Sequence, residues 1–325
     1  MKRWIKPFDY VFLLRPVLFY PVWTIFLAGI LSVQGASSGY GWPEFKIGLS
    51  SRHLDKFLFA FVGYSLLMGA VFIINQLTDI STDRKNSKLF LIADEHVSPR
   101  AAVREILIVL FIAFGLALNT SGWFLLVMFA ALIVTGVAYS LPPFFLKNKP
   151  LYGLLVNLSG GMLTFFAGWL AISGPSLQMA IRSLPYVFAV GAVYFLTTIL
   201  DAEGDLHSQK ITFAVYFGMR TTLQMAVLFD AVAAVLAFVV RDWIIFISAV
   251  ISCFLFVFLF IKKDSVWLNR ATRLPILLLA FIEALYLPVY FLGIIGIYLL
   301  SKWYYRNRFG LNYPSLNPSH IGKEA

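Results

Sequence analysis

The chain has very little of what soluble and secreted proteins use to build structure or bind metals. Its 325 residues contain a single cysteine, Cys253, and four histidines that lie far apart in the sequence. One cysteine excludes a disulfide framework and a cysteine-based zinc site, and scattered histidines do not suggest a histidine-rich metal site. Only 13% of the residues are charged, whereas 60% are hydrophobic. Together with a mean hydropathy of +0.82, this composition excludes a soluble globular domain and indicates a polytopic membrane protein.

Two further sequence patterns are missing. No segment shows the apolar–polar alternation of a membrane β-strand, so a β-barrel is not expected. No G-x-x-x-x-G-K-[ST] loop occurs, so any phosphate group would have to be bound in another way. In a chain this apolar, the net charge of +10 reports topology and anionic headgroups and does not predict nucleic-acid binding. The lipid bilayer is the expected environment, no nucleic acid is expected, and no protein partner is deducible.

Long apolar segments dominate what is present, and a hydrocarbon core of ~30 Å needs about 20 such residues per helix. The qualifying segments are 16–34, 56–78, 102–119, 122–141, 151–173, 183–201, 222–240, 243–261 and 274–300. The last segment is long enough to tilt, or to break near Pro288. We therefore expect an all-α membrane protein, with about nine transmembrane helices in one bundle around an interior apolar cavity that opens near the cytoplasmic face. The expected organisation is one domain over 1–325, with a short N-terminal segment 1–15 and a polar tail at about 302–325.

The distribution of basic residues predicts the orientation. Most of the 26 Lys and Arg residues fall in the N-terminal segment and in the loops that follow every second predicted helix. The positive-inside rule places these parts in the cytoplasm, and an odd number of helices would leave the C-terminal tail on the opposite side. We expect an integral, multi-pass protein of a prokaryotic plasma membrane.

Polar residues recur at four-residue intervals where the second predicted helix ends. Asn75, Asp79 and Asp83 stand at i, i+4 and i+8, so on a continuous helix they share one stripe. Carboxylate and amide oxygens in a line suit Mg²⁺. The simpler interpretation is a helix end that turns polar as it leaves the bilayer.

A second acidic pair favours the metal interpretation. Asp201 and Asp205 are again four residues apart, with Glu203 between them, at the end of the sixth predicted helix. Both pairs are predicted at the same membrane face and both are followed by basic residues, among them Lys210 after the second pair. Four converging carboxylates repel one another unless cations neutralise them. Bound Mg²⁺ with a polyphosphate would satisfy such a cluster, with Lys and Arg holding the remaining phosphate oxygens.

The loop after the fourth predicted helix lies on the same predicted face. Pro142 and Pro143 end that helix, and Lys147 follows at the mouth of the bundle. A Lys at this place is usually a topology signal, but beside two acidic clusters it is a candidate diphosphate ligand. Asn157 lies one or two turns into the next helix, where a polar pocket would explain it. Asp230 and Glu283 are ionisable residues inside predicted membrane helices, and their spacing assigns neither to the site.

Four segments together resemble one known family. The stretch "NQLTDISTDRKNSK" resembles the N-x-x-x-D-x-x-x-D motif of the UbiA superfamily of intramembrane prenyltransferases, and "DAEGD" resembles its second aspartate motif. The loop "YSLPPFFLK" resembles the family's Y-S-x-P-P-x-x-L-K loop, and "LRPVLFYPVW" fits its early Arg-Pro. The motifs occur in the family's order along essentially the whole chain. Phe145 departs from the pattern, because relatives often have Arg before the Leu-Lys of that loop.

The resemblance implies a Mg²⁺-dependent prenyltransferase that moves a prenyl group from an isoprenyl diphosphate to a lipophilic acceptor, an aromatic one being favoured. It implies that Asp79, Asp83, Asp201 and Asp205 are the catalytic metal ligands. The residues that it assigns to the diphosphate are Asn75, Arg84, Lys88, Lys147, Lys210, Asn157 and Tyr139. Loss of diphosphate leaves an allylic cation that the acceptor captures, and the ring of Tyr139 is one candidate to stabilise that cation.

Two other functions fit parts of the same pattern. A membrane terpene cyclase would use the same ionisation chemistry without an acceptor, and product analysis with the donor alone separates the two. A secondary transporter would use intramembrane carboxylates for protons or cations. Against transport, the acids cluster at one face and not at the midplane. Mg²⁺-dependent release of diphosphate by the purified protein would discriminate between transport and transfer.

Overall fold

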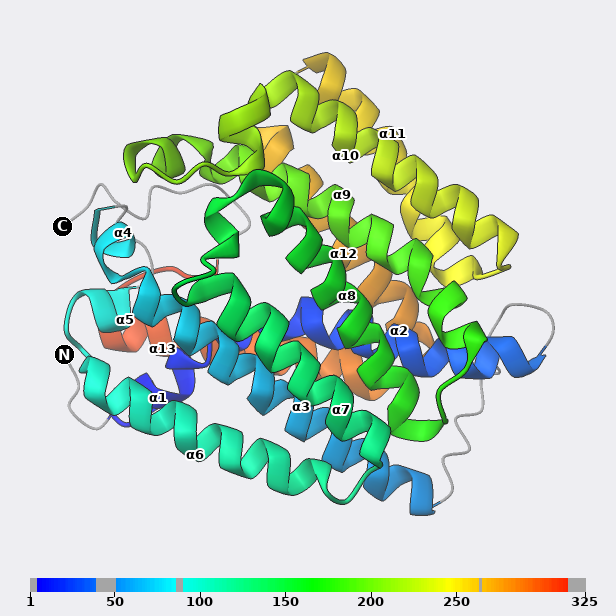
Figure 1. The fold of residues 1–325 in the computed structure, drawn as a ribbon, viewed down its shortest axis with the longest axis horizontal. Helices are drawn as coiled ribbons and strands as arrows, with labels where there is room; N and C mark the ends of the chain where they lie inside the picture. Colours follow the sequence, from blue (N-terminus) through cyan, green and yellow to red (C-terminus); the bar gives the residue numbers. More distant parts are fainter. Residues whose placement is uncertain (1–4, 39–50, 86–89, 263–264, 315–325) are drawn as a thin grey trace.

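The computed structural model describes residues 5–38, 51–85, 90–262 and 265–314, and the regular structure of these ranges is helical throughout (Figure 1). The long helices are α2 (Phe19–Ser38), α3 (Ser51–Thr78), α6 (Pro99–Ala117), α8 (Pro150–Ile172), α9 (Leu177–His207), α10 (Phe213–Val239), α11 (Trp243–Lys262), α12 (Ser265–Tyr286) and α13 (Pro288–Phe309). The short elements are α1 (Phe8–Leu13), α4 (Ile80–Lys85), α5 (Phe90–Ala93), α7 (Gly122–Ala131), two 3₁₀ turns at Pro16–Leu18 and Leu146–Asn148, and a π-helix, η3 (Leu132–Ala138).

Every predicted apolar segment falls on described helices, but two differ from the expectation. The segment 122–141 is not one regular helix, because α7 passes into the π-helix η3. The segment 274–300 is divided between α12 and α13, which meet at Leu287, as expected where Pro288 cannot donate a backbone hydrogen bond.

Six stretches of the described residues are long and apolar enough to cross a membrane, fewer than the nine predicted. They are Phe8–Gly35, Leu54–Thr78, Pro150–Ile172, Leu177–His207, Phe213–Val239 and Trp243–Lys262. Gly122–Ala138 is a shorter apolar helix. These features establish an integral, multi-pass membrane protein.

Local sequence fixes where several helices begin. Ser98, Ser121 and Ser176 each precede a helix and accept a hydrogen bond from the backbone N–H three residues later. A serine in this position satisfies one of the donors that the first helical turn leaves without a partner. The tight connection before Gly122 therefore sets α6 and α7 as a hairpin.

Glycines bring α2 and α8 into direct backbone contact. A Cβ atom on Gly168 would overlap the carbonyl of Phe26, and one on Gly29 would overlap the carbonyl of Phe165. Small residues permit this close approach in membrane helices, where packing and not the hydrophobic effect drives association. The α2–α8 crossing is the fixed frame beside which the central cavity lies.

The first and last described helices are bound to each other. The hydroxyl of Tyr304 on α13 donates to Asp9 Oδ1 on α1 at 2.8 Å, and Arg308 donates to both carboxylate oxygens at 3.0 and 2.9 Å. Phe12 stacks on Tyr304 with ring centroids 3.7 Å apart. In Figure 1, α1 and α13 accordingly lie together at the left of the bundle.

The prediction that the C-terminal tail lies opposite the N-terminus is wrong. The break after α12 adds a helix, and α13 returns the chain to the side of α1. The tail was expected at about 302–325, but 302–309 belong to α13, and 315–325 lie outside the described residues.

Candidate functional site

Three of the predicted polar segments meet at Asp79. Lys147 Nζ lies 2.9 Å from Asp79 Oδ2, and Lys210 Nζ lies 2.8 Å from Asp79 Oδ1. Lys147 also donates to Thr78 Oγ1 at 2.8 Å. The side chain of Asp79 is 13% exposed and those of Lys147 and Lys210 are 7% and 16% exposed. One carboxylate is therefore shared by two largely buried ammonium groups from different loops.

The backbone at Asp79 is not the continuous helix that the spacing predicted. The helix α3 ends at Thr78 and α4 begins at Ile80, with Asp79 at the break. The Asp79 N–H still donates to the Asn75 carbonyl at 3.1 Å, and the Asp83 N–H donates to the Asp79 carbonyl at 2.7 Å. The backbone hydrogen bonds between residues four apart therefore continue from α3 into α4, although the helix is interrupted at Asp79. The side chain of Asp79 contacts the two lysines at this interruption.

Asp83 is buried, at 8% exposure, on the short helix α4. Burial, followed by the negative charge of Asp79, raises the pKa of Asp83 to about 7, although Lys210, Arg15 and Lys147 act in the opposite direction. Burial also lowers the pKa of Lys147 from its ordinary value, although the negative charge of Asp79 acts in the opposite direction. A carboxyl group whose ionisation is opposed by burial and by a neighbouring carboxylate is one that an added cation would stabilise in its charged form.

Arg15 joins this cluster and was absent from the predicted site residues. It interacts electrostatically with Asp83 and Asp201, and its backbone is left-handed, with φ 56°, directly before Pro16. A non-glycine residue in this region is strained and is found where the surrounding structure holds it. The Arg-Pro pair in "LRPVLFYPVW" was the sequence signal that could have added Arg15 to the site.

The second acidic pair lies on the last two turns of α9, where the four-residue spacing does hold on a continuous helix. Asp201 and Asp205 both interact electrostatically with Tyr139, as does Asp79. The Asp205 carbonyl accepts the backbone N–H of Lys210 at 2.8 Å. This turn returns the chain so that the side chain of Lys210 reaches Asp79. The two acidic segments therefore lie on either side of one polar region.

Tyr139 and Asn157 mark the boundary between this polar region and the apolar interior. Tyr139 directly follows the π-helix η3, and irregular turns of this kind occur often at functional sites. The side chain of Asn157 hydrogen-bonds with the Tyr139 hydroxyl and donates from Nδ2 to the Gly153 carbonyl at 2.8 Å. Both residues, with Asn75, line the central cavity.

Of the predicted basic residues, Arg84 does not join the cluster. Arg84 donates to the Ala93 carbonyl at 3.0 and 2.6 Å and pairs with Glu95 at 3.4 Å. Its guanidinium therefore connects α4 to Ala93 at the end of α5 and to Glu95 just beyond it. Its predicted contact with diphosphate stays a prediction. Lys88 lies outside the described residues.

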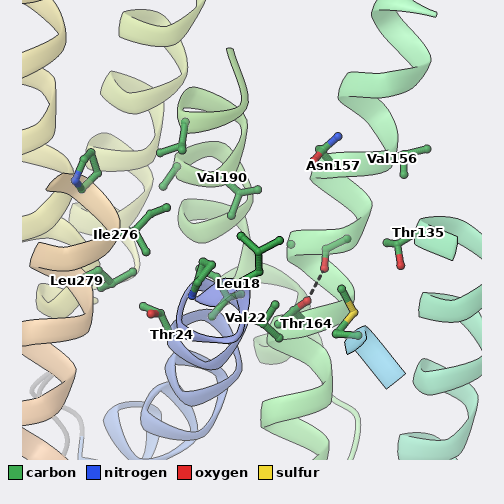
Figure 2. A pocket seen from close by; sticks show the side chains of 18 of the residues that line it. Leu18, Val22, Thr24, Thr135, Val156, Asn157, Thr164, Val190, Ile276 and Leu279 are labelled. Carbon is green, nitrogen blue, oxygen red and sulfur yellow. Dashed lines mark hydrogen bonds between the residues drawn. The ribbon is translucent and has the colours of Figure 1, made fainter. Parts of the chain in front are cut away.

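The cavity beside this polar region has a volume of about 350 Å³, within the usual range for a small-molecule site. Figure 2 shows side chains from several helices around it: Asn157 from α8, Val190 from α9, Leu279 from α12 and Thr24 from α2. Most lining residues are apolar. The combination of a charged end and an apolar chamber suits a molecule with a charged head and a hydrocarbon tail.

Carboxylate and amide oxygens are the donors that Mg²⁺ prefers, so the chemistry of this cluster fits that ion. Within the described ranges, however, no group of three or more His, Cys, Asp or Glu side chains lies close enough to hold a metal by itself. The acids therefore fit a metal ion that takes its remaining oxygen ligands from a bound molecule.

Comparison with known proteins identifies the fold and the family. The sequence profile of the UbiA prenyltransferase family matches residues 22–285. The chain therefore belongs to the UbiA prenyltransferase family, as its motifs predicted. A UbiA homologue from Archaeoglobus fulgidus, solved bound to GPP and Mg²⁺, has a TM-score of 0.68 and 25% identity, covering 88% of this chain and 99% of that one.

Two curated relatives are plant enzymes. The chain is 30% identical over 165 residues to 2-acyl-4-prenylphloroglucinol 6-prenyltransferase, chloroplastic, of Humulus lupulus, covering 46% of this chain and 38% of the relative. It is 30% identical over 177 residues to probable homogentisate phytyltransferase 2, chloroplastic, of Oryza sativa subsp. japonica, covering 50% of this chain and 45% of the relative. The chain thus spans less than half the length of the curated relatives that it matches.

Proposed function

We propose that this protein transfers a prenyl group from an isoprenyl diphosphate to a hydroxylated aromatic acceptor, in a Mg²⁺-dependent reaction. The observation that carries the proposal is the Asp79 carboxylate held between Lys147 and Lys210 at the polar end of an apolar cavity. The two ammonium groups provide donors for a further anion, and the acids around them, Asp83 among them, would be neutralised by the cation that accompanies a diphosphate. The bound GPP and Mg²⁺ of the archaeal homologue, and the aromatic compounds named for the plant relatives, support the substrate classes.

At the polar end of the cavity, the acidic and the basic residues would have different roles in binding the diphosphate. Asp79 and Asp83 on one side and Asp201 and Asp205 on the other would hold Mg²⁺ together with diphosphate oxygens. Bound Mg²⁺ supplies a Lewis acid that neutralises charge on the leaving diphosphate. Lys147, Lys210 and Arg15 hold the remaining phosphate oxygens, a role in which charge-assisted hydrogen bonds are strong.

The apolar chamber controls what happens after ionisation. The carbon–oxygen bond of the donor breaks and its electron pair leaves with the diphosphate. A ring carbon of the acceptor then bonds to the allylic carbon and loses a proton. The apolar lining would keep water away from the allylic cation, and the ring of Tyr139, which lines the cavity and interacts with the acids, would stabilise the cation through its π face.

We also propose the membrane setting. Residues 1–325 would form one membrane domain whose helices cross the bilayer an even number of times, its cavity opening at the polar end near the cytoplasmic face of a prokaryotic plasma membrane. The excess of Lys and Arg on the N-terminal side supports this orientation. A fusion reporter placed after the described C-terminal residues would locate that end in the cytoplasm; a reporter active outside would contradict the orientation.

Product mass spectrometry tests the proposed reaction. Purified protein would be offered labelled geranyl or geranylgeranyl diphosphate with homogentisate, 4-hydroxybenzoate or an acylphloroglucinol, with Mg²⁺ or with a chelator. We expect a prenylated aromatic product that requires Mg²⁺. Cyclised or hydrolysed donor at equal yield with and without acceptor would instead indicate a cyclase or a hydrolase.

Matched variants connect that reaction to the acids. Asp201→Asn and Asp79→Asn should each lower turnover at least about a hundredfold, because a metal ligand is lost. Glu203→Gln is the control, since Glu203 is exposed between the two acids on the same helix and points away from their shared face. Full activity in Asp201→Asn would remove the second acidic pair from the site.

A further inference from the structure

One carboxyl group in the cavity wall is left without a partner. Asp230 on α10 lines the central cavity and is 2% exposed. Its Oδ2 atom makes no hydrogen bond with any described residue. A buried polar group without a partner is costly, and an ionisable residue inside a membrane bundle usually has a functional role.

The serine and threonine hydroxyl groups of the same wall are all satisfied by the protein. Each donates to a backbone carbonyl of its own or a neighbouring helix: Thr24 to Tyr20, Thr135 to Ala131, Thr164 to Gly160, Ser248 to Pro275 and Ser252 to Ser248. These hydroxyls therefore need nothing from a ligand. Asp230 differs from them in offering a strong acceptor atom to whatever fills the cavity.

Asp230 lies far from the diphosphate end. Its neighbour Phe229 packs directly against Gly191 of α9, which is ten residues before Asp201 and hence about 15 Å along the helix. Asp230 also interacts electrostatically with Cys253 on α11. The carboxyl group thus sits in the apolar part of the chamber, beside α11, where the head of the donor does not reach.

We propose that Asp230 binds the hydroxyl group of the aromatic acceptor and so fixes the orientation of the acceptor ring in the chamber. The inference rests on the function proposed above. The prenyl chain of the donor is hydrocarbon and has no hydrogen to donate, so it gives no reason for a carboxyl group at this depth. A phenolic hydroxyl donates to Oδ2 and satisfies it, while the ring packs on the aliphatic wall.

A second buried aspartate provides the matched control. Asp242 lies at the turn between α10 and α11, is 3% exposed, and does not line the cavity. Its Oδ2 accepts hydrogen bonds from Ser32 at 3.0 Å and Tyr186 at 3.1 Å. Both aspartates belong to the same helical hairpin, but Asp242 is satisfied by the protein and Asp230 is not.

The experiment compares Asp230→Leu with Asp242→Leu, using homogentisate and 4-hydroxybenzoate as acceptors and geranyl diphosphate as donor. Loss of a buried hydrogen bond should raise the acceptor KM about ten- to a hundredfold in Asp230→Leu. The donor KM should stay within about twofold, because that variant leaves the diphosphate end intact, and the melting temperature should not fall. Asp242→Leu should show the reverse: a lower melting temperature and an unchanged acceptor KM.

A methyl-ether analogue of the acceptor sharpens the test. Wild type should use the hydroxyl compound well and the methyl ether poorly, and Asp230→Leu should lose most of that discrimination. An unchanged acceptor KM in Asp230→Leu, or an equal rise of donor and acceptor KM, would overturn the proposal.

Failure of this inference can be told apart from failure of the proposed function. If wild type prenylates a hydroxylated aromatic and Asp230→Leu does so with an unchanged acceptor KM, the role of Asp230 is overturned and the proposed function stands. If wild type prenylates none of the hydroxylated aromatics, the proposed function itself is overturned.

Discussion

Asp9 is buried and Asp79 is largely buried. Both pair with basic side chains, yet their surroundings differ in one respect. Asp9 is 1% exposed and meets a single guanidinium, that of Arg308, with Tyr304 completing its hydrogen bonds. Asp79 is shared by Lys147 and Lys210 and lies beside a cavity. The first arrangement is balanced and closed, whereas the second has more positive than negative charge at the shared contact and a space next to it. A balanced buried pair indicates a structural role, and an unbalanced one indicates a ligand.

The difference has energetic consequences. Breaking one member of a closed buried pair leaves an uncompensated charge in a medium that cannot solvate it, so the folded state is destabilised. At Asp79, removing one of the two lysines leaves the other to pair with the carboxylate, so the folded state loses little. The same change removes an interaction with the diphosphate leaving group. Substitutions at the Asp9–Arg308 pair should therefore lower stability, and substitutions at the Asp79 cluster should lower activity.

The largest effect is expected from the lysines. Lys147→Met and Lys210→Met should each lower kcat/KM for the donor by about a hundred- to a thousandfold, because each removes a charge-assisted contact to the departing diphosphate. The melting temperature should change little. Steady-state kinetics with geranyl diphosphate and a thermal melt in the same detergent would check both, with Lys302→Met on α13 as the control. Activity within a few-fold of wild type would mean that the unbalanced charge serves no ligand.

A smaller effect, of the opposite kind, is expected at the closed pair. Arg308→Met should lower the free energy of unfolding by about 3 kcal/mol, since it leaves Asp9 buried without its counter-charge. The folded fraction should keep wild-type kcat/KM. Titration with a denaturing detergent would measure the free energy of unfolding, and an assay of activity per folded molecule would measure kcat/KM. Arg306→Met is the matched control, because Arg306 is exposed on the same helix. Selective loss of activity in Arg308→Met would make α1 and α13 part of the catalytic apparatus.

The smallest effect is expected at Arg84. Its partners are the Ala93 carbonyl and Glu95, and its pair with Glu95 has side chains 57% and 81% exposed. Exposed pairs contribute less than about 1 kcal/mol, so Arg84→Gln should change stability slightly and kcat/KM by less than about threefold. The kinetic assay used for the lysines is sufficient. A loss comparable with that of Lys147→Met would restore Arg84 to the diphosphate site.

Much of the site could be predicted because its parts are local in sequence. Apolar runs of membrane length located the helices, and polar residues at their ends could only gather at the membrane face. Lys147 and Lys210 were expected there from their loops. That they share the carboxylate of Asp79 could not be read from spacing, because the pairs join residues 68 and 131 positions apart through the packing of the whole bundle.

The errors have equally specific causes. The break at Asp79 has no proline or glycine to announce it, since it is imposed by tertiary contacts. The return of α13 depends on Asp9 and Arg308, which are 299 positions apart. Asp230 and Asp242 are both acids in apolar surroundings. Only the packed structure shows that Ser32 and Tyr186 satisfy one of them and that nothing described satisfies the other.

The central claim is that the polar end of the cavity binds a diphosphate together with Mg²⁺ through Asp79. It is tested most directly by the equilibrium dissociation constant of geranyl diphosphate, measured with and without Mg²⁺ for wild type and Asp79→Asn. The account predicts that Mg²⁺ tightens binding to wild type at least about tenfold, or ~1.4 kcal/mol. In Asp79→Asn we expect weaker binding with a smaller enhancement by Mg²⁺, because one of the four proposed carboxylate ligands is lost. The same enhancement by Mg²⁺ in both proteins would contradict the claim.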